Sequence, residues 1–154
     1  MEIRRFRPED AQETALVIAK TLRVSNSRDY PEEFIEQNIA SHSAEELIKA
    51  SNERHMYVIC DGDRIIGTGG IAGYWGSLTE SILLTVFILP EYQGKGLGRK
   101  LIDTLEQDEY FLRAQRIEIP ASLTAVQFYR KMGYDYKNGI TEPDDGMYRL
   151  EKYR

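Results

Sequence analysis

The chain has 154 residues, of which 42% are hydrophobic and 29% are charged, and these values are ordinary for a globular domain with a hydrophobic core. Its net charge of −5 argues against non-specific binding to nucleic acid and favours a cationic ligand, such as an amine. No apolar run approaches the roughly 20 residues that span a bilayer, so no membrane segment is expected. The N-terminus also lacks the apolar stretch of a signal peptide.

A single cysteine, Cys60, excludes an internal disulfide bond and fits a reducing, cytoplasmic setting. Because it lies in an apolar run, we interpret it as a small strand residue rather than a nucleophile. The chain shows no repeats, low-complexity tracts or linkers, so we expect one domain over residues 1–154. We predict no metal site.

The first half of the chain predicts one strand, three helices and a hairpin. Pro8 suits the first turn of a helix, and Glu9 and Asp10 suit the positive end of its dipole. The hairpin is indicated by a polar, glycine-containing turn at 61–63. The apolar face of the first helix is expected to comprise Ala15, Leu16, Ala19 and Leu22. The elements are a strand over 2–6, helices from 8 to a polar break at 25–30, over 31–39 and over 44–52, and strands over 56–60 and 64–71.

The middle of the chain predicts a buried strand, a glycine-rich turn and a helix. Residues 86–89 are all apolar, which is typical of a strand covered on both faces. They end a central strand over 81–89, which stops at Pro90 because proline has no N–H group to donate. The turn contains Gly94, Gly96 and Gly98. The following helix is expected over 99–112, with an apolar face of Leu101, Ile102, Leu105 and Leu112.

This glycine turn predicts an anion site. A loop that opens a helix leaves several backbone N–H groups unpaired, and they point outward at the positive end of the helix dipole. Lys95, Arg99 and Lys100 add positive charge beside them. The expected ligand group is therefore a phosphate or pyrophosphate.

Two other phosphate-binding motifs do not fit. A P-loop needs Lys and then Ser or Thr after its last glycine, whereas Gly98 is followed by Arg99 and Lys100. Residues 67–72 match the Gly-x-Gly-x-x-Ala form of a dinucleotide fingerprint, but residues 73–77 cannot continue as the helix which that motif requires.

The last third of the chain predicts a strand, a helix and two more strands. The strand is expected over 116–119, with Pro120 at its end. The helix is expected over 122–131, with Ser122 as its cap and Gly133 just past its end. The closing strands are expected over 134–137 and 147–152.

Two segments together carry a family resemblance. The first is the pattern Gln-x-x-Gly-x-Gly at Gln93, Gly96 and Gly98, directly after a strand and a proline. The second is 125–134, which resembles the segment A-x-x-F-Y-x-x-x-G-F/Y at the same order and spacing. The chain thus resembles the GCN5-related N-acetyltransferase superfamily, closely over 57–136 and loosely elsewhere.

The resemblance implies an α/β (α+β) fold with a central mixed, mostly antiparallel sheet of about seven strands flanked by helices. It also implies acetyl-CoA as co-substrate, with its pyrophosphate on the glycine loop and its pantetheine arm along the central strand. Ser122 departs from the asparagine that many members have at this position. The expected cofactor-binding residues are Val86, Phe87, Ile88, Gln93, Gly94, Lys95, Gly96, Leu97, Gly98, Arg99, Ser122 and Tyr129.

The implied reaction is acetyl transfer to a primary amine of a small molecule, peptide or protein. A backbone N–H near Phe87 or Ile88 would polarise the thioester carbonyl. Tyr129 would protonate the leaving thiolate, although it also fits a packing role beside Phe128. The base is open between Glu118 and Glu80. Either can instead be an exposed carboxylate, and water or an already neutral acceptor can replace a base.

The acceptor itself is not identified by the sequence. The resemblance assigns acceptor specificity to 24–38, 73–80 and 138–146, and we expect His42 and His55 to be surface residues. Two other classes of function stay open: a non-catalytic sensor of acyl-CoA, and a structural domain that has lost the ligand. The chain is expected to be a monomer or homodimer.

Overall fold

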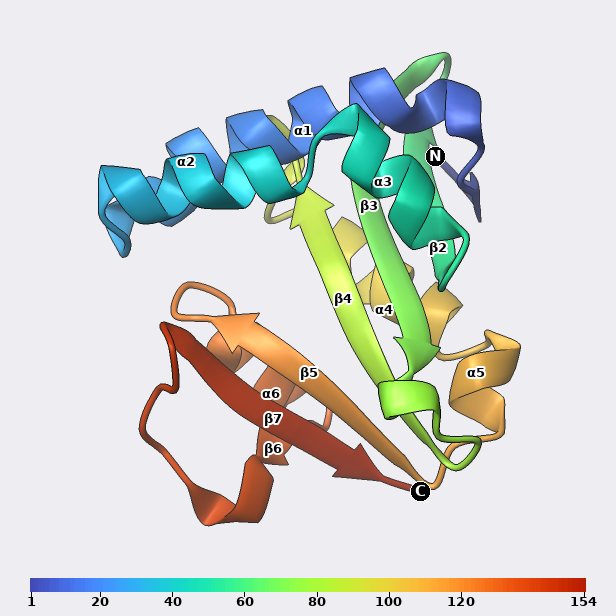
Figure 1. The fold of residues 1–154 in the computed structure, drawn as a ribbon, viewed down its shortest axis with the longest axis vertical. Helices are drawn as coiled ribbons and strands as arrows, with labels where there is room; N and C mark the ends of the chain where they lie inside the picture. The colour runs from blue at the N-terminus through green and yellow to red at the C-terminus, as the bar shows by residue number, and fades with distance from the viewer.

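The computed structural model describes residues 1–154. The helices and strands follow one another in largely the expected order (Figure 1). In chain order they are β1 (Glu2–Arg5), α1 (Ala11–Val24), α2 (Glu32–Ser41), α3 (Ala44–Ser51), β2 (His55–Asp61), β3 (Arg64–Gly73), β4 (Glu80–Ile88), α4 (Leu97–Leu105), α5 (Glu109–Leu112), β5 (Arg116–Ser122), α6 (Val126–Lys131), β6 (Asp135–Tyr136) and β7 (Met147–Tyr153).

Seven strands form one mixed sheet in the order β1-β2-β3-β4-β5-β7-β6. All neighbours are antiparallel except β4 and β5, which are parallel and pair at only three positions, from Glu80 opposite Arg116 to Ile82 opposite Glu118. Beyond these pairs the two strands diverge, and the sheet opens as a V between them (Figure 1). The expected fold class, a mixed and mostly antiparallel sheet flanked by helices, is confirmed.

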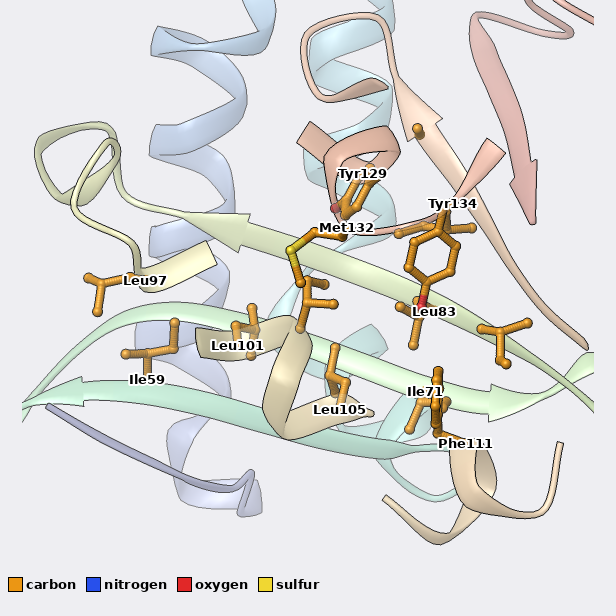
Figure 2. Close-up of a cluster of buried hydrophobic side chains, with 14 of the residues drawn as sticks. Ile59, Ile71, Leu83, Leu97, Leu101, Leu105, Phe111, Tyr129, Met132 and Tyr134 are labelled. Carbon is orange, nitrogen blue, oxygen red and sulfur yellow. The ribbon is translucent and has the colours of Figure 1, made fainter. Parts of the chain in front are cut away.

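Helices cover both faces of the sheet. α1, α2 and α3 lie over one face, and α4, α5 and α6 lie over the other (Figure 1). The larger hydrophobic cluster lies on the α4 side and joins both arms of the V. Figure 2 shows Leu101 and Leu105 of α4 near Leu83 of β4, with Tyr129 and Tyr134 close by. No helix combines the length and the apolar character that crossing a membrane requires.

The apolar face expected for α1 is wrong at one position. Leu16 is 71% exposed, whereas Ile18 is fully buried. The two residues are separated by about 200° of helical rotation, so they lie on opposite sides of the helix. Cys60 is buried in β2, and burial raises the pKa of its thiol, which confirms the interpretation as a strand residue.

The single helix expected over 99–112 is also wrong. α4 begins at Leu97 and ends at Leu105, and a new helix, α5, begins at Glu109. The Asp108 side chain caps α5 by accepting a hydrogen bond from the Tyr110 N–H at 2.8 Å. The break rotates Leu112 out of the core, and its side chain is 53% exposed.

The end of β5 also differs from the expectation. The strand continues through Pro120 to Ser122, and α6 begins only at Val126, with Ala125 rather than Ser122 at the cap position. Proline is tolerated here because β5 has no partner on its β4 side beyond Glu118, so no ladder hydrogen bond is lost on that edge. For the same reason 86–88 are only half-buried, not covered on both faces.

Candidate functional site

The site begins at the N-terminus of α4. Gly94 and Gly96 have φ of +75° and +80°, a region that favours glycine, and they turn the chain from the end of β4 into the helix. The backbone N–H groups of 94–99 have no partner within the chain. Lys95 and Arg99 are exposed and form no ion pair. The loop is therefore a group of free donors at the positive end of a helix dipole.

Gly98 and Gln93 have different structural roles in the same loop. A Cβ at Gly98 would lie 3.0 Å from the Phe128 ring, so glycine allows α6 to pack closely against the start of α4. The Gln93 Nε2 donates to the Ile88 carbonyl at 2.8 Å and to the Ser25 hydroxyl at 3.2 Å. Gln93 thus holds the loop against the end of β4.

A β-bulge interrupts β4 beside the opening of the V. Thr68 pairs with Phe87 and Gly70 pairs with Leu84, so Thr85 and the residue after it lie opposite one residue of β3. Thr85 has φ of +59°, which is strained for a β-branched residue. The extra residue leaves part of the backbone outside the ladder, next to the position expected to polarise a carbonyl.

A cleft of about 800 Å³ runs through the V between β4 and β5. It brings together most of the expected cofactor residues: Val86, Phe87, Ile88, Gln93, Gly94, Gly96, Gly98, Arg99, Ser122 and Tyr129. Lys95 and Leu97 do not line it, because the Lys95 ammonium lies over the Tyr92 ring and Leu97 is buried in the core.

Tyr129 reaches this cleft from α6. It is 5% exposed and belongs to the hydrophobic cluster drawn in Figure 2. Its ring meets the Phe128 ring edge-on at 5.2 Å, and its hydroxyl has no hydrogen-bond partner within the chain. Burial raises its pKa, so the hydroxyl keeps its proton at neutral pH. The side chain is therefore a packing aromatic that also presents a protonated hydroxyl at the wall of the cleft.

The comparisons with known proteins agree with this geometry. The family model for the acetyltransferase (GNAT) domain matches residues 8–147. The chain belongs to the GNAT acetyltransferase family. No curated protein matches it.

Several solved structures share the fold of this GNAT domain. The PaiA N-acetyltransferase from Thermoplasma acidophilum, in complex with coenzyme A, has a TM-score of 0.84 at 22% identity and covers 99% of this chain and 98% of its own. A GCN5-related N-acetyltransferase from Rhodopseudomonas palustris has a TM-score of 0.82 at 23% identity, with coverage of 99% and 95%. An aminoglycoside 6'-N-acetyltransferase in complex with coenzyme A has a TM-score of 0.69 at 19% identity, with coverage of 98% and 94%.

The two carboxylates considered as bases lie at the closed end of the V in this GNAT domain. Arg116 donates to Glu80 at 2.7 Å, to Glu151 at 2.7 Å and to Glu118. Glu118 is buried, not exposed, and Lys137 approaches it at 2.8 Å. Burial alone would raise the pKa of Glu118, but the hydrogen bonds from Lys137 and Arg116 outweigh it and hold the pKa low.

A second cavity, of about 790 Å³, opens on the α1–α3 side of the sheet. We call it the side cavity. Glu118 lines it, whereas Glu80 lines neither the side cavity nor the cleft. Two of the loops expected to set acceptor specificity contribute to it, through residues 73–75 and through Asn138, Ile140, Glu142 and Asp144. Leu84 and Arg54 line both cavities, so the two spaces meet there.

Among the residues of the cleft that sequence reasoning missed are His42, Arg54 and Thr85. His42 and His55 are half-buried rather than surface residues, because His42 contacts Phe87 and His55 is held by Asp108. No local motif marks these positions. His42 and Arg54 reach the cleft because the segments after α2 and α3 pack against β4.

Replacing Arg116 tests the closed end of the V. Arg116→Gln leaves three carboxylates close together, and we expect it to lower the free energy of unfolding by about 3 kcal/mol, at the low end for a broken buried ion pair because Glu80 is partly exposed. The measurement is urea unfolding followed by circular dichroism. Arg23→Gln, which breaks an exposed pair with Glu36, is the control and is expected to change little. An equal loss of unfolding free energy in both variants would contradict the stabilising role of Arg116 at the closed end of the V.

Proposed function

We propose that this GNAT domain, acting as one domain, transfers the acetyl group of acetyl-CoA to a primary amine of a small molecule, peptide or protein. The observation that carries the proposal is the cleft through the V, which combines a free anion loop, an unpaired stretch of strand and a buried tyrosine hydroxyl. Acetyl-CoA would supply an acyl group activated as a thioester. The remaining chemistry belongs to the chain.

The residues of the cleft fit this co-substrate. The free N–H groups of 94–99, with Arg99 beside them, suit a pyrophosphate. The backbone of 86–88 has no strand partner on its β5 side, and an extended arm can pair with it as an added strand. Coenzyme A is present in the PaiA and aminoglycoside enzymes, which share the fold.

Tyr129 is the proposed proton donor. Its raised pKa keeps the phenol protonated, so it can give a proton to a departing thiolate of comparable basicity. The bulge at Thr85 supports a nearby backbone N–H as the group that polarises the carbonyl. In this proposal the Tyr129 hydroxyl and the backbone N–H near Thr85 act from opposite walls of one cleft.

The geometry weighs against Glu118 and Glu80 as the base. Both accept hydrogen bonds from Arg116, and neither lines the cleft. A carboxylate with a lowered pKa, as in Glu118, has little tendency to take a proton. A base in this protein is better sought on the α1–α3 side of the V.

Thermal unfolding with excess acetyl-CoA tests the co-substrate. A ligand at about 100 times its Kd stabilises a protein by about 2.7 kcal/mol, so we expect a clear rise in Tm with acetyl-CoA and none with NAD or ATP. Gly96→Ala should reduce the rise, because alanine disfavours the φ of +80° at the anion loop. Gly62→Ala is the matched control, since Gly62 has φ of +61° in the distant β2–β3 turn and equally open surroundings. Absence of any shift in the unmodified protein would overturn the proposed co-substrate.

Tyr129→Phe tests the proton donor. We expect kcat to fall by about 100-fold, within the usual contribution of a general acid, with little change in the affinity for acetyl-CoA. Tyr134→Phe is the control, because this buried tyrosine donates to Glu106 and does not line the cleft. An unchanged kcat in Tyr129→Phe, with chemistry established as rate-limiting, would contradict the role. A protein that binds acetyl-CoA but never releases free thiol would instead be a sensor.

A further inference from the structure

Arg54 is an unpaired cation where the cleft and the side cavity meet. One Nη of its guanidinium donates to the Thr85 hydroxyl at 3.2 Å, and its Nε is buried with no partner. It forms no ion pair. The other two cations of the side cavity do have carboxylates beside them, since Lys137 pairs with Glu118 and Arg149 lies 3.9 Å from Asp144.

The surroundings of Arg54 favour binding of an anionic group from a ligand. Arginine stays charged in proteins, and a half-buried charge without a partner is unfavourable, which is the reason that burial lowers its pKa. The anion loop at 94–99 lies at the other end of the cleft and has its own donors. The partner of Arg54 therefore belongs to the acceptor.

Resting on the proposed function, we propose that Arg54 binds a carboxylate of the acceptor, so that the substrate is an amino acid with its carboxylate close to the reacting nitrogen. Guanidinium and carboxylate form strong charge-assisted hydrogen bonds. Glu53, Glu142 and Asp144 line the same side cavity and disfavour a dianion such as phosphate. They are compatible with a zwitterion, whose positive charge offsets its carboxylate.

The test compares amino acids with the amines that lack only the carboxylate, such as phenylalanine with phenethylamine and lysine with cadaverine. The measured quantity is kcat/KM for thiol release. We expect the unmodified enzyme to prefer the carboxylated member of a pair by at least about tenfold, and Arg54→Gln to abolish that preference. Arg149→Gln is the matched control, because it removes the other arginine of the side cavity, which has Asp144 beside it, and it should retain the preference.

Three results would overturn the proposal: no preference in the unmodified enzyme, equal loss for both members in Arg54→Gln, or the same loss of preference in Arg149→Gln. Failure to acetylate any amino acid, in a protein whose Tm still rises with acetyl-CoA, would also overturn it and leave the proposed function intact. Absence of that rise would overturn the proposed function itself.

A separate observation concerns His42, which lines the cleft and meets the Phe87 ring edge-on at 5.5 Å. Its Nδ1 lies 2.7 Å from the Asn38 carbonyl, which can only accept a hydrogen bond. Nδ1 therefore carries the proton, and Nε2 is left with a lone pair and no partner within the chain. Asn38 thus orients the ring and selects the tautomer that can take a proton.

From this geometry we infer that His42 is the general base of the proposed transfer. The lone pair of the neutral amine forms the new C–N bond, and the C–S bond of the thioester breaks. The amine nitrogen loses one proton to the His42 Nε2. The Tyr129 hydroxyl protonates the departing sulfur, and water carries a proton from His42 back to Tyr129. Burial and the positive charge of Arg54 both lower the pKa of His42, so the ring is neutral at pH 7. Arg54 is the charged group that acts on it; Asn38 and Phe87 are neutral.

His55→Gln is a matched control for His42→Gln, because these are the only two histidines and Asp108 holds His55 away from the cleft. We expect His42→Gln to lower kcat by about 100-fold and to retain the acetyl-CoA shift in Tm. It should also remove the acid limb of the kcat/KM profile whose midpoint lies below 6.5, since the limb at higher pH comes from protonation of the amine substrate and stays in every variant. His55→Gln should keep both the rate and the limb. Retention of the limb in His42→Gln would overturn the inference.

Nitrogen-15 NMR of the unliganded protein tests the same inference without activity or substitution. The expected result is an Nδ1–H tautomer for His42 and a midpoint below 6.5, the ordinary value for histidine. An Nε2–H tautomer would leave no lone pair in the cleft and would overturn the role.

Discussion

The short pairing between β4 and β5 is the constraint on which the rest of this structure depends. Three residue pairs join the strands, and Arg116 holds that end through Glu80, Glu118 and Glu151, which come from β4, β5 and β7. A longer parallel ladder would fill the V with backbone hydrogen bonds. Because the ladder stops early, a cleft of about 800 Å³ passes between the strands.

The two faces of that opening carry different chemistry. On one face the glycine loop and α6 supply free N–H groups and the Tyr129 hydroxyl. On the other, the segments after α2 and α3 supply His42 and Arg54. The bulge at Thr85 connects the two faces, because the extra residue puts Leu84 and Phe87 on the same side of β4 while Leu83 and Val86 point into the opposite core. The proposed proton donor and the inferred base thus face the V from opposite sides.

Much of the fold and of the glycine loop could be predicted from the sequence, because the signals are local. The loop at 93–98 and the segment at 125–134 are contiguous, and the strands have apolar runs bounded by turn residues. The predictions from sequence were wrong where contacts with other segments determine the local structure. Pro120 lies within β5 only because the neighbouring strand has diverged, and Leu112 leaves the core only because Asp108 begins a new helix.

His42 and Arg54 could not be predicted as residues of the cleft for the same reason. His42 and Arg54 follow short helices in ordinary polar sequence, and only tertiary packing brings them to the cleft. Glu118 illustrates the opposite case. Its position in β5 matched a plausible base, but Arg116 lies two residues away on the same face of the strand and pairs with it. A single sequence does not reveal which carboxylates are free and which belong to an ion network.

The most direct test of this account is the change in backbone amide chemical shifts when acetyl-CoA is added to labelled protein. We predict that the largest changes fall on the N–H groups of 94–99 and on 86–88 of β4, with smaller changes across β1 and the β2–β3 turn. Changes concentrated in the side cavity, with the loop and β4 unaffected, would contradict the claim that the V between β4 and β5 is the binding site.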